Sequence, residues 1–379
     1  MRSAPAAAPL AAADFALGEG VVYLNHAAAG VLPVRTRDAL LTLINGQAER
    51  GVLGFISAEA ALPAIRRRIS RFIGGGDDGP VALLRNTGDG ANVVARGLDW
   101  TPGDEIVLCD NEFGANAMPW LSLREYGVVI RFIRTPRERM TPDVLRREMS
   151  PRTRVVAVSW VSFFDGYRHD LAALSEIAHD GGALFCVDAI QGLGAFPLDV
   201  GALRIDALYA GGAKWLLALP GVGFLYVAPH LFERLTLRWR GWRDVADIWN
   251  FLDYDQPPAP DGSRFEGGTP NFHGAVAIAN SMDVIEAGGL ERIAAHVVAL
   301  TDRLVDGLQS LGAVVATERG PGISSGIVTF SLPGVDSVEL GRRLGKAGIV
   351  TTFRPTGLRV SPHGHNPASH IDTLLEALR

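Results

Sequence analysis

The chain has 379 residues, which is long for a single core and favours two domains or one large domain with an appendage. Hydrophobic residues make up 47% and charged residues 20% of the sequence, as in an ordinary soluble globular protein. A net charge of −5 argues against a nucleic-acid or anionic-membrane partner, and no stretch is apolar for long enough to span a membrane.

The first fifteen residues are rich in alanine but contain prolines and Asp14. These residues interrupt any continuous apolar core of the length that a signal peptide needs. We therefore expect a loose tail on a cytoplasmic protein.

Between residues 80 and 230, strand and helix patterns alternate. The short apolar runs lie at 81–84, 105–109, 128–133, 154–160, 183–188, 206–210 and 223–227. Helical patterns between them lie at 91–98, 120–125 and 171–179. This alternation predicts a mostly parallel sheet covered on both faces, with a ligand at the carboxyl ends of the strands.

The chain from residue 228 onward is organised differently. Residues 228–270, rich in Trp, Asp, Pro and Arg, predict a long excursion over an active site or a subunit contact. A helical region at 275–311 is interrupted near 288–289. Short strand patterns with helices at 337–347 and 370–378 then predict a smaller α+β domain.

Cysteine and lysine are both rare. Cys109 and Cys186 each lie in an apolar run, which predicts reduced core thiols and neither a disulfide framework nor a metal site. Lys214 and Lys346 are the only lysines, whereas Lys and Arg together number 36. A retained lysine is then better explained by its amine chemistry, which arginine lacks.

Asp188 ends the predicted strand 183–188 and would face the ligand edge of the sheet. A carboxylate there suits a protonated pyridine nitrogen, which such a partner turns into an electron sink. Gln191 could reach an oxygen on the same ring. The alternative for Asp188 is a helix N-cap.

Lys214 follows twenty-six residues after Asp188, beyond a pair of glycines and among apolar neighbours. Desolvation there would lower the pKa of the amine and make it a nucleophile toward an aldehyde. The alternative is a lysine that extends its charge into solvent.

Residues 86–90, Asn-Thr-Gly-Asp-Gly, connect a predicted strand to a helix. Free backbone N–H groups, a hydroxyl and small residues at a helix N-terminus suit a phosphate. An ordinary capped helix is the alternative.

Together these motifs resemble the class V aminotransferase family of fold type I pyridoxal 5′-phosphate (PLP) enzymes. That family includes cysteine desulfurases, selenocysteine lyases and isopenicillin N epimerase-like proteins. The resemblance runs from about Val22 to near the C-terminus. It rests on the motifs VDAIQG (187–192), KWLLALPGVGFLYV (214–227), YLNHAAAG (23–30), EFGANAMPW (112–120), GYRHDLAAL (166–174), RFEGGTPN (264–271) and LRVSPHGHN (358–366).

The resemblance implies an α/β protein with the fold of type I PLP-dependent transferases. It implies a large PLP-binding domain at 20–260 with a mostly parallel seven-stranded sheet. Linking helices and a small α+β C-terminal domain would occupy 261–379, and the segment 1–19 would associate with the small domain. The family also implies a cytoplasmic homodimer with the active site at the interface.

The resemblance assigns a role to each of a set of side chains. Lys214 would be the catalytic residue and hold the cofactor as a Schiff base. The other cofactor contacts would be Asp188 at the pyridine nitrogen, Gln191 at the phenolic oxygen, Thr87 and Gly88 at the phosphate, Phe113 on the ring, and Thr269 at the phosphate across a dimer interface.

Arg359 would bind the substrate carboxylate, for which a guanidinium fork is suited. His363 and Asn366 lie in the same motif, and Asn25 and His26 would also lie at the substrate. For Arg359, the alternative is a surface residue on an edge strand.

The sequence also departs from the family pattern. Phe113 stands where cysteine desulfurases have a histidine, residues 211–213 lack the family's serine and histidine, and Phe163 replaces an asparagine. The loop 351–357 lacks the mobile cysteine that accepts sulfur in desulfurases. Because persulfide transfer needs an exposed thiolate, we do not expect sulfur donation to a protein acceptor.

The expected chemistry is formation of an external aldimine with an amino acid, followed by Cα deprotonation by Lys214. We favour a class V aminotransferase-like reaction, with C–S lysis by β-elimination or amino-acid epimerisation as alternatives. A non-catalytic binding module is the alternative from another class. A nucleotide-binding dehydrogenase is disfavoured because residues 85–92 lack the GxGxxG spacing.

Overall fold

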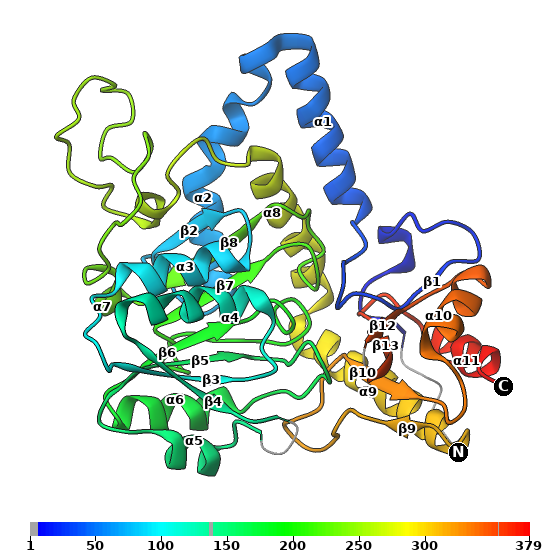
Figure 1. Cartoon of the computed structure of the whole chain (residues 1–379). Coiled ribbons are helices and arrows are strands. Elements are labelled where there is room, and N and C mark those ends of the chain that lie inside the picture. The colour runs from blue at the N-terminus through cyan, green and yellow to red at the C-terminus, as the bar shows by residue number, and fades with distance from the viewer. Residues whose placement is uncertain (1–6, 136–138, 355) are drawn as a thin grey trace.

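A computed structural model describes residues 7–135, 139–354 and 356–379. Its centre is a seven-stranded sheet in the order β2-β8-β7-β6-β5-β3-β4 (Figure 1). The strands are β2 (Val81–Leu84), β3 (Glu105–Cys109), β4 (Val129–Ile133), β5 (Thr153–Ser159), β6 (Leu184–Asp188), β7 (Ala207–Gly211) and β8 (Gly223–Val227). In this sheet β8 runs antiparallel to both its neighbours, and the other pairings are parallel. The prediction of a mostly parallel seven-stranded sheet is confirmed.

Apolar side chains cover both faces of the sheet, because successive residues of a strand point to opposite sides. On β3, Val107 packs into one buried cluster, and Ile106 and Leu108 pack into the other. The helices divide in the same way. One face is covered by α2 (Ile56–Phe72), α5 (Pro142–Glu148), α6 (Leu171–Asp180) and α8 (Phe272–Gly288), and the other by α3 (Thr87–Gly97), α4 (Gly114–Leu121) and α7 (Pro229–Phe232).

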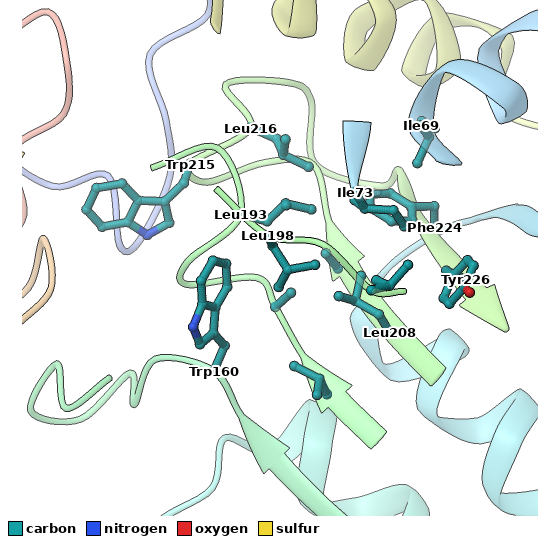
Figure 2. Packing of buried hydrophobic residues seen from close by; sticks show 14 of the residues in the cluster. Ile69, Ile73, Trp160, Leu193, Leu198, Leu208, Trp215, Leu216, Phe224 and Tyr226 are labelled. Atoms are coloured by element: carbon teal, nitrogen blue, oxygen red, sulfur yellow. The ribbon is translucent and has the colours of Figure 1, made fainter. Parts of the chain in front are cut away.

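The first of these clusters extends beneath the loop that carries Lys214. Figure 2 shows Leu193 and Leu198 close together in this cluster, with Leu216 of that loop next to them, while the ring of Trp215 extends to the other side of the loop. Because this packing is dense, the lysine loop is supported by the same core that holds the strands.

The helix α3 begins at Thr87, four residues before the helical pattern suggested. Its first turn contains Gly88 and Gly90, which are weak helix formers. Gly90 is required by packing, because a Cβ there would lie 2.5 Å from the Cβ of Tyr209 on β7. Close approach to the sheet therefore overrides local propensity. The predicted helix at 120–125 is instead the end of α4 followed by a 3-10 helix at Ser122–Tyr126.

Two long helices near the N-terminus were absent from our sequence prediction. They are α1 (Val34–Arg50) and α2, joined by a 3-10 turn at Gly51–Gly54. In Figure 1, α1 extends away from the sheet. The apolar side chains Leu41 and Ile44 of α1 are about half exposed, which blurs the amphipathic pattern by which a surface helix is recognised.

The C-terminal part of the chain forms a second, antiparallel sheet in the order β12-β13-β10-β9. Its strands are β9 (Val314–Val315), β10 (Val328–Ser331), β12 (Thr352–Arg354) and β13 (Gly357–Val360). The helices of this part are α9 (Leu290–Ser310), α10 (Ser337–Lys346) and α11 (Ala368–Ala377). The predicted break in the long helical region is confirmed at Gly289, whose φ of 76° ends α8 and starts α9.

The N-terminal segment is packed against this C-terminal part. The Leu10 N–H donates to the Gly364 carbonyl at 3.1 Å, and the Phe15 ring stacks on His365 with centroids 4.3 Å apart. For the residues described, the expectation of a loose tail is therefore wrong. Residues 1–6 of that predicted tail lie outside the described part of the chain.

The strand β1 (Val22–Tyr23) pairs in parallel with β11 (Ile349–Val350). The start of the predicted large domain is thus hydrogen-bonded to the C-terminal part. The division at 19 and 260 remains a prediction. None of the helices described is both long and apolar enough to cross a membrane.

Candidate functional site

The predicted cofactor residues lie at one edge of the large sheet, where the parallel strands have their carboxyl ends. Asp188 is the last residue of β6, and it is in register with Tyr209 on the adjacent β7. Lys214 follows three residues after β7 ends at Gly211. Each of these two side chains shifts the pKa of the other through its charge, so the two predicted residues face the same space.

Asp188 is almost completely buried and only half satisfied. Its Oδ1 accepts a hydrogen bond from the Ile190 N–H at 3.0 Å, while Oδ2 is buried with no partner among the described residues. No helix begins among the described residues 189–206, between β6 and β7, so the N-cap alternative is wrong. Because a buried, unpaired carboxylate oxygen is costly, its environment fits a cationic group of a ligand.

Burial is the largest cause that raises the pKa of Asp188, and the charge of Glu112 raises it further, whereas Lys214 opposes the shift. Glu112 lies in the turn between β3 and α4 and is held against the last residue of β5. It accepts hydrogen bonds from the Ser159 backbone N–H at 2.8 Å and from the Ser159 hydroxyl. A cation at Asp188 Oδ2 would relieve this concentration of negative charge.

The Lys214 amine is held close to an aromatic ring. Its Nζ lies 5.4 Å from the centroid of the Phe113 ring. Burial lowers the pKa of Lys214 to about 8, and the nearby charges of Arg359 and Arg354 also lower it, against the opposing effect of Asp188. A lysine that extends into solvent would not be shifted in this way, and a larger neutral fraction makes the amine more nucleophilic.

The backbone around Lys214 is fixed by contacts from distant segments. The Gly30 N–H donates to the Ala213 carbonyl at 2.7 Å, and a Cβ on Gly30 would lie 2.2 Å from the Lys214 carbonyl oxygen. Leu217 is fully buried with a φ of 56°, and its carbonyl accepts a hydrogen bond from the Ser281 hydroxyl at 2.7 Å. A left-handed leucine is a strained conformation, which the surrounding packing holds in place.

The N-terminus of α3 lies at the same edge of the sheet. Asn86 caps the helix by accepting from the Asp89 N–H at 2.9 Å. The buried Thr87 hydroxyl oxygen accepts from the Gly211 N–H at 3.0 Å, which ties α3 to the end of β7. Its O–H remains a donor, and the first N–H groups of a helix have no intrahelical partner. This turn, including Gly88, is therefore a capped helix N-terminus that also has the donors to bind a phosphate.

Gln191, Trp215 and His363 form a buried chain of hydrogen bonds. The Trp215 indole donates to Gln191 Oε1 at 2.9 Å, and Gln191 Nε2 donates to the Ala27 carbonyl at 3.0 Å. Gln191 thus keeps one N–H for a ring oxygen, and its predicted contact stays a prediction.

His363 is fixed at the end of this chain. Its Nε2 contacts the Trp215 carbonyl at 3.0 Å, and its Nδ1 accepts from the Gly364 N–H at 2.6 Å. The predicted substrate contact of His363 finds no free ring nitrogen, because both are engaged by the protein. Asn366, from the same motif, donates to the Tyr23 carbonyl at 2.9 Å.

Arg359 lies on β13 and is fully buried. Its Nη1 donates to the Phe163 carbonyl at 3.0 Å, whereas Nε and Nη2 have no partner in the described part of the chain. Burial, followed by the charge of Arg354, lowers the pKa of Arg359 to about 9. The surface alternative for Arg359 is wrong, and the unpaired N–H groups fit a carboxylate.

His26 lies near Trp215, with ring centroids 6.2 Å apart, and Asn25 precedes it in the chain. His26 Nδ1 contacts the Ser361 carbonyl at 3.0 Å, while its Nε2 and the Asn25 Oδ1 are buried without a described partner. Burial lowers the pKa of His26 well below its ordinary value, and His365 and His363 lower it further. Each residue keeps one polar atom free, and their role at the substrate stays a prediction.

Phe113 and Thr269 lie closer to the surface. The Phe113 side chain is 47% exposed and packs edge-to-face on Phe163, with centroids 5.1 Å apart. Thr269 is exposed just before α8. An exposed Thr269 agrees with the predicted contact across a dimer interface but does not test it.

Three residues at the site were missed in the sequence prediction. Trp215 was noted only as an apolar neighbour of Lys214, and Glu112 only as part of a motif. Arg354 on β12 was not noticed, although it lies two residues from Thr352, the partner of Arg359 in the sheet. The alternation of side chains along a strand could have placed Arg354 on the same face.

The geometry accommodates a molecule with three features: an aldehyde for Lys214, a cationic ring nitrogen for Asp188, and a phosphate for the N-terminus of α3. Pyridoxal phosphate has all three. The aromatic side chain of Phe113 beside Lys214 Nζ is suited to cover such a ring.

Comparison with known proteins gives the same result. The family model described as aminotransferase class V matches residues 22–369. A cysteine desulfurase of Klebsiella pneumoniae is 30% identical over 388 residues, covering 96% of this chain and 93% of that protein. A probable cysteine desulfurase of Methanothermobacter thermautotrophicus is 29% identical over 395 residues, covering 96% of each chain.

Solved structures share the fold. An apo cysteine desulfurase from Thermococcus onnurineus superposes with a TM-score of 0.87 at 26% identity, covering 96% of this chain and 95% of that one. A cystine C–S lyase, at 22% identity and a TM-score of 0.86, shares the fold over 95% of this chain and 97% of its own. The chain therefore belongs to the class V aminotransferase family and is a PLP-dependent enzyme of fold type I.

Proposed function

We propose that Lys214 holds PLP covalently and that the enzyme deprotonates the Cα of an amino acid whose carboxylate binds at Arg359. The observation that carries this proposal is the pair formed by Asp188 and Lys214 at neighbouring strand ends. One is a buried carboxylate with an unpartnered Oδ2, and the other an amine of lowered pKa. When bound, PLP supplies a ring that takes up the electron pair left on Cα.

In this proposal Lys214 has two tasks. It first anchors the cofactor, and it becomes free when the amine of the substrate takes its place. Its Nζ would then remove the Cα proton and pass it on, to a carbon of the cofactor in an aminotransferase-type reaction, for which a pKa near the working pH is suited. Asp188 keeps the ring nitrogen protonated, because its Oδ2 has no other partner. Thr87 and the first N–H groups of α3 bind the phosphate.

Arg359 orients the substrate through Nε and Nη2, which a carboxylate can accept as a pair. The bond from Nη1 to the Phe163 carbonyl fixes the guanidinium before the substrate arrives. Phe113 covers one face of the ring and limits access of water. A phenylalanine has no proton to transfer, so proton movement at Cα falls to Lys214.

We favour an aminotransferase-type reaction, in which the proton taken from Cα is not returned to that carbon. Persulfide transfer through the chain's own thiols is disfavoured because Cys109 and Cys186 are both buried in strands. Burial raises the pKa of each thiol well above its ordinary value, so neither is a ready nucleophile.

A second candidate is C–S lysis by β-elimination, with release of a small sulfur product. The observation that favours it is that relatives covering almost the whole chain are named cysteine desulfurases. Cleavage of the C–S bond needs the same first proton transfer by Lys214, and release to solvent needs no thiol of the protein.

We also propose that the enzyme works as a homodimer. Large apolar side chains are exposed on two segments that protrude from the body in Figure 1, the α1–α2 region and the excursion at 239–254. They are Leu41, Ile44, Val52, Leu53, Ile56, Trp239, Trp242, Trp249, Phe251, Leu252 and Tyr254. So many exposed apolar side chains support a protein–protein contact. Sedimentation equilibrium at micromolar concentration should give a dimer, and a monomer would count against this proposal.

The first test exploits the two lysines. Lys214→Ala should abolish the cofactor absorbance above 400 nm that borohydride reduces, because Lys214 is the lysine that lies beside Asp188 at the site. Lys346→Ala is the matched control, since Lys346 is exposed at the end of α10. It should keep the full absorbance. Reducible absorbance retained by Lys214→Ala would refute the assignment, and peptide mapping of the reduced protein would identify the residue responsible.

The second test addresses the carboxylate. Asp188→Asn removes the negative charge at nearly constant shape, so turnover should fall by about 100-fold or more. The midpoint of chemical unfolding of the cofactor-free protein should stay the same or rise, because an unsatisfied buried charge is removed. Equal turnover in the variant, or a loss of stability that accounts for the lost turnover, would contradict the role of Asp188.

The third test separates the two reactions. The purified holoenzyme is incubated with a panel of amino acids, and keto acid, sulfide and loss of optical rotation are assayed. We expect keto acid in an amount equal to the cofactor converted to its amine form, without sulfide. Sulfide and pyruvate from cysteine at catalytic turnover would instead establish C–S lysis, and loss of optical rotation without either product would establish epimerisation.

A further inference from the structure

The hairpin of β12 and β13 carries a second arginine beside the one proposed to bind the substrate. Arg359 on β13 is in register with Thr352 on β12, and Arg354 follows Thr352 by two residues. Residues directly opposite in an antiparallel pair, and those two positions further along, share one face of the sheet. Arg354 and Arg359 therefore lie on the same face. Phe353, between Thr352 and Arg354, is 54% exposed on the opposite face.

Arg354 has no anionic partner among the residues that the structure describes. Its Nη1 donates only to the Phe353 carbonyl, at 3.0 Å, and its Nε is buried without a partner. Burial lowers the pKa of Arg354, so its guanidinium is partly removed from water. Most other arginines of this protein form ion pairs, such as Arg342 with Glu339 on α10.

The Arg354 charge acts on the interior of the site. It lowers the pKa of both Arg359 and Lys214, in agreement with the shared face that the strand register gives to Arg354 and Arg359. The site thus gathers three cationic side chains. Asp188 faces them, but its free Oδ2 is proposed to pair with the ring nitrogen of the cofactor.

A substrate with one carboxylate leaves part of this positive charge without an anionic partner. The α-carboxylate satisfies Arg359, while Arg354 stays partly buried, without an anionic partner and next to like charges, an arrangement that is costly. An anionic group on the substrate side chain would remove that cost and would use the free Nε of Arg354 in a charge-assisted hydrogen bond.

We infer that the substrate is an amino acid with a second carboxylate on its side chain, and that Arg354 is the residue that selects it. This inference rests on the proposed function, because it assigns the α-carboxylate to Arg359. Arg354 contacts the distal carboxylate, and its cross-strand partner on β13 is Gly357, which has no side chain to compete with the ligand. The two arginines would thus hold the two ends of the substrate.

The inference is tested by binding of unreactive acids, measured by calorimetry on the holoprotein. Succinate and butyrate are matched in carbon number and differ in the second carboxylate. The wild type should bind succinate about 10- to 100-fold more tightly than butyrate, the range expected for one charge-assisted hydrogen-bonded pair. Arg354→Gln should bring the affinity for succinate close to that for butyrate, and Arg354→Lys should restore part of the preference.

Two further variants complete the design. Arg359→Gln should weaken the binding of both acids, because both use the α-carboxylate site. Arg342→Gln removes one exposed arginine from α10 and should keep the wild-type preference for succinate. Thermal unfolding and the cofactor absorbance of each variant verify that the fold and the cofactor site are intact.

Equal affinity of the wild type for succinate and butyrate would overturn the inference, and so would a preference that survives Arg354→Gln. Failure of the proposed function is seen separately, as absence of borohydride-reducible absorbance in the wild type. In that case the same titrations on the cofactor-free chain still decide the role of Arg354, because both arginines belong to the protein. Activity with aspartate or glutamate but not with asparagine or glutamine would be the corresponding kinetic result.

Discussion

The site depends on two oppositely charged side chains that adjacent strands bring out of water together. Asp188 and Lys214 follow β6 and β7, so the parallel pairing of these strands places a carboxylate and an amine at the same edge of the sheet. Burial shifts the pKa of each toward its neutral form. The two side chains do not neutralise each other fully, because Asp188 Oδ2 and the Lys214 amine both remain available to a ligand. A cofactor with a cationic end and an aldehyde completes both.

The core supports this arrangement through packing as well as electrostatics. Gly30 and Gly90 allow close contacts that a Cβ would prevent, the first with the Lys214 carbonyl and the second with the Tyr209 side chain on β7. Leu217 is kept in a strained conformation by burial and by Ser281. The lysine loop is thus held by contacts from distant segments, which fix the amine relative to the carboxylate.

The small-domain side of the site has the opposite character, with cationic groups that lack partners. Arg359 and Arg354 enter from one hairpin, and between them three guanidinium nitrogens are buried without a hydrogen bond. A protein that places such groups together needs an anionic ligand to satisfy them. The substrate is therefore expected to contribute the negative charge that this side of the site lacks.

The seven strands of the large sheet and the residues Lys214, Asp188 and Thr87 could be found from the sequence, because each depends on local patterns of apolar, glycine and charged residues. Residues 34–72 escaped prediction as helices, since the exposed apolar side chains of α1 obscure its period. The hydrogen bonds of His363 and the free groups of Arg354 and Arg359 depend on segments far apart in the chain, such as Trp215 and Phe163. Local sequence therefore determined which reactive residues this protein has. Only the tertiary structure decided which of their polar groups lack a protein partner and can bind a ligand.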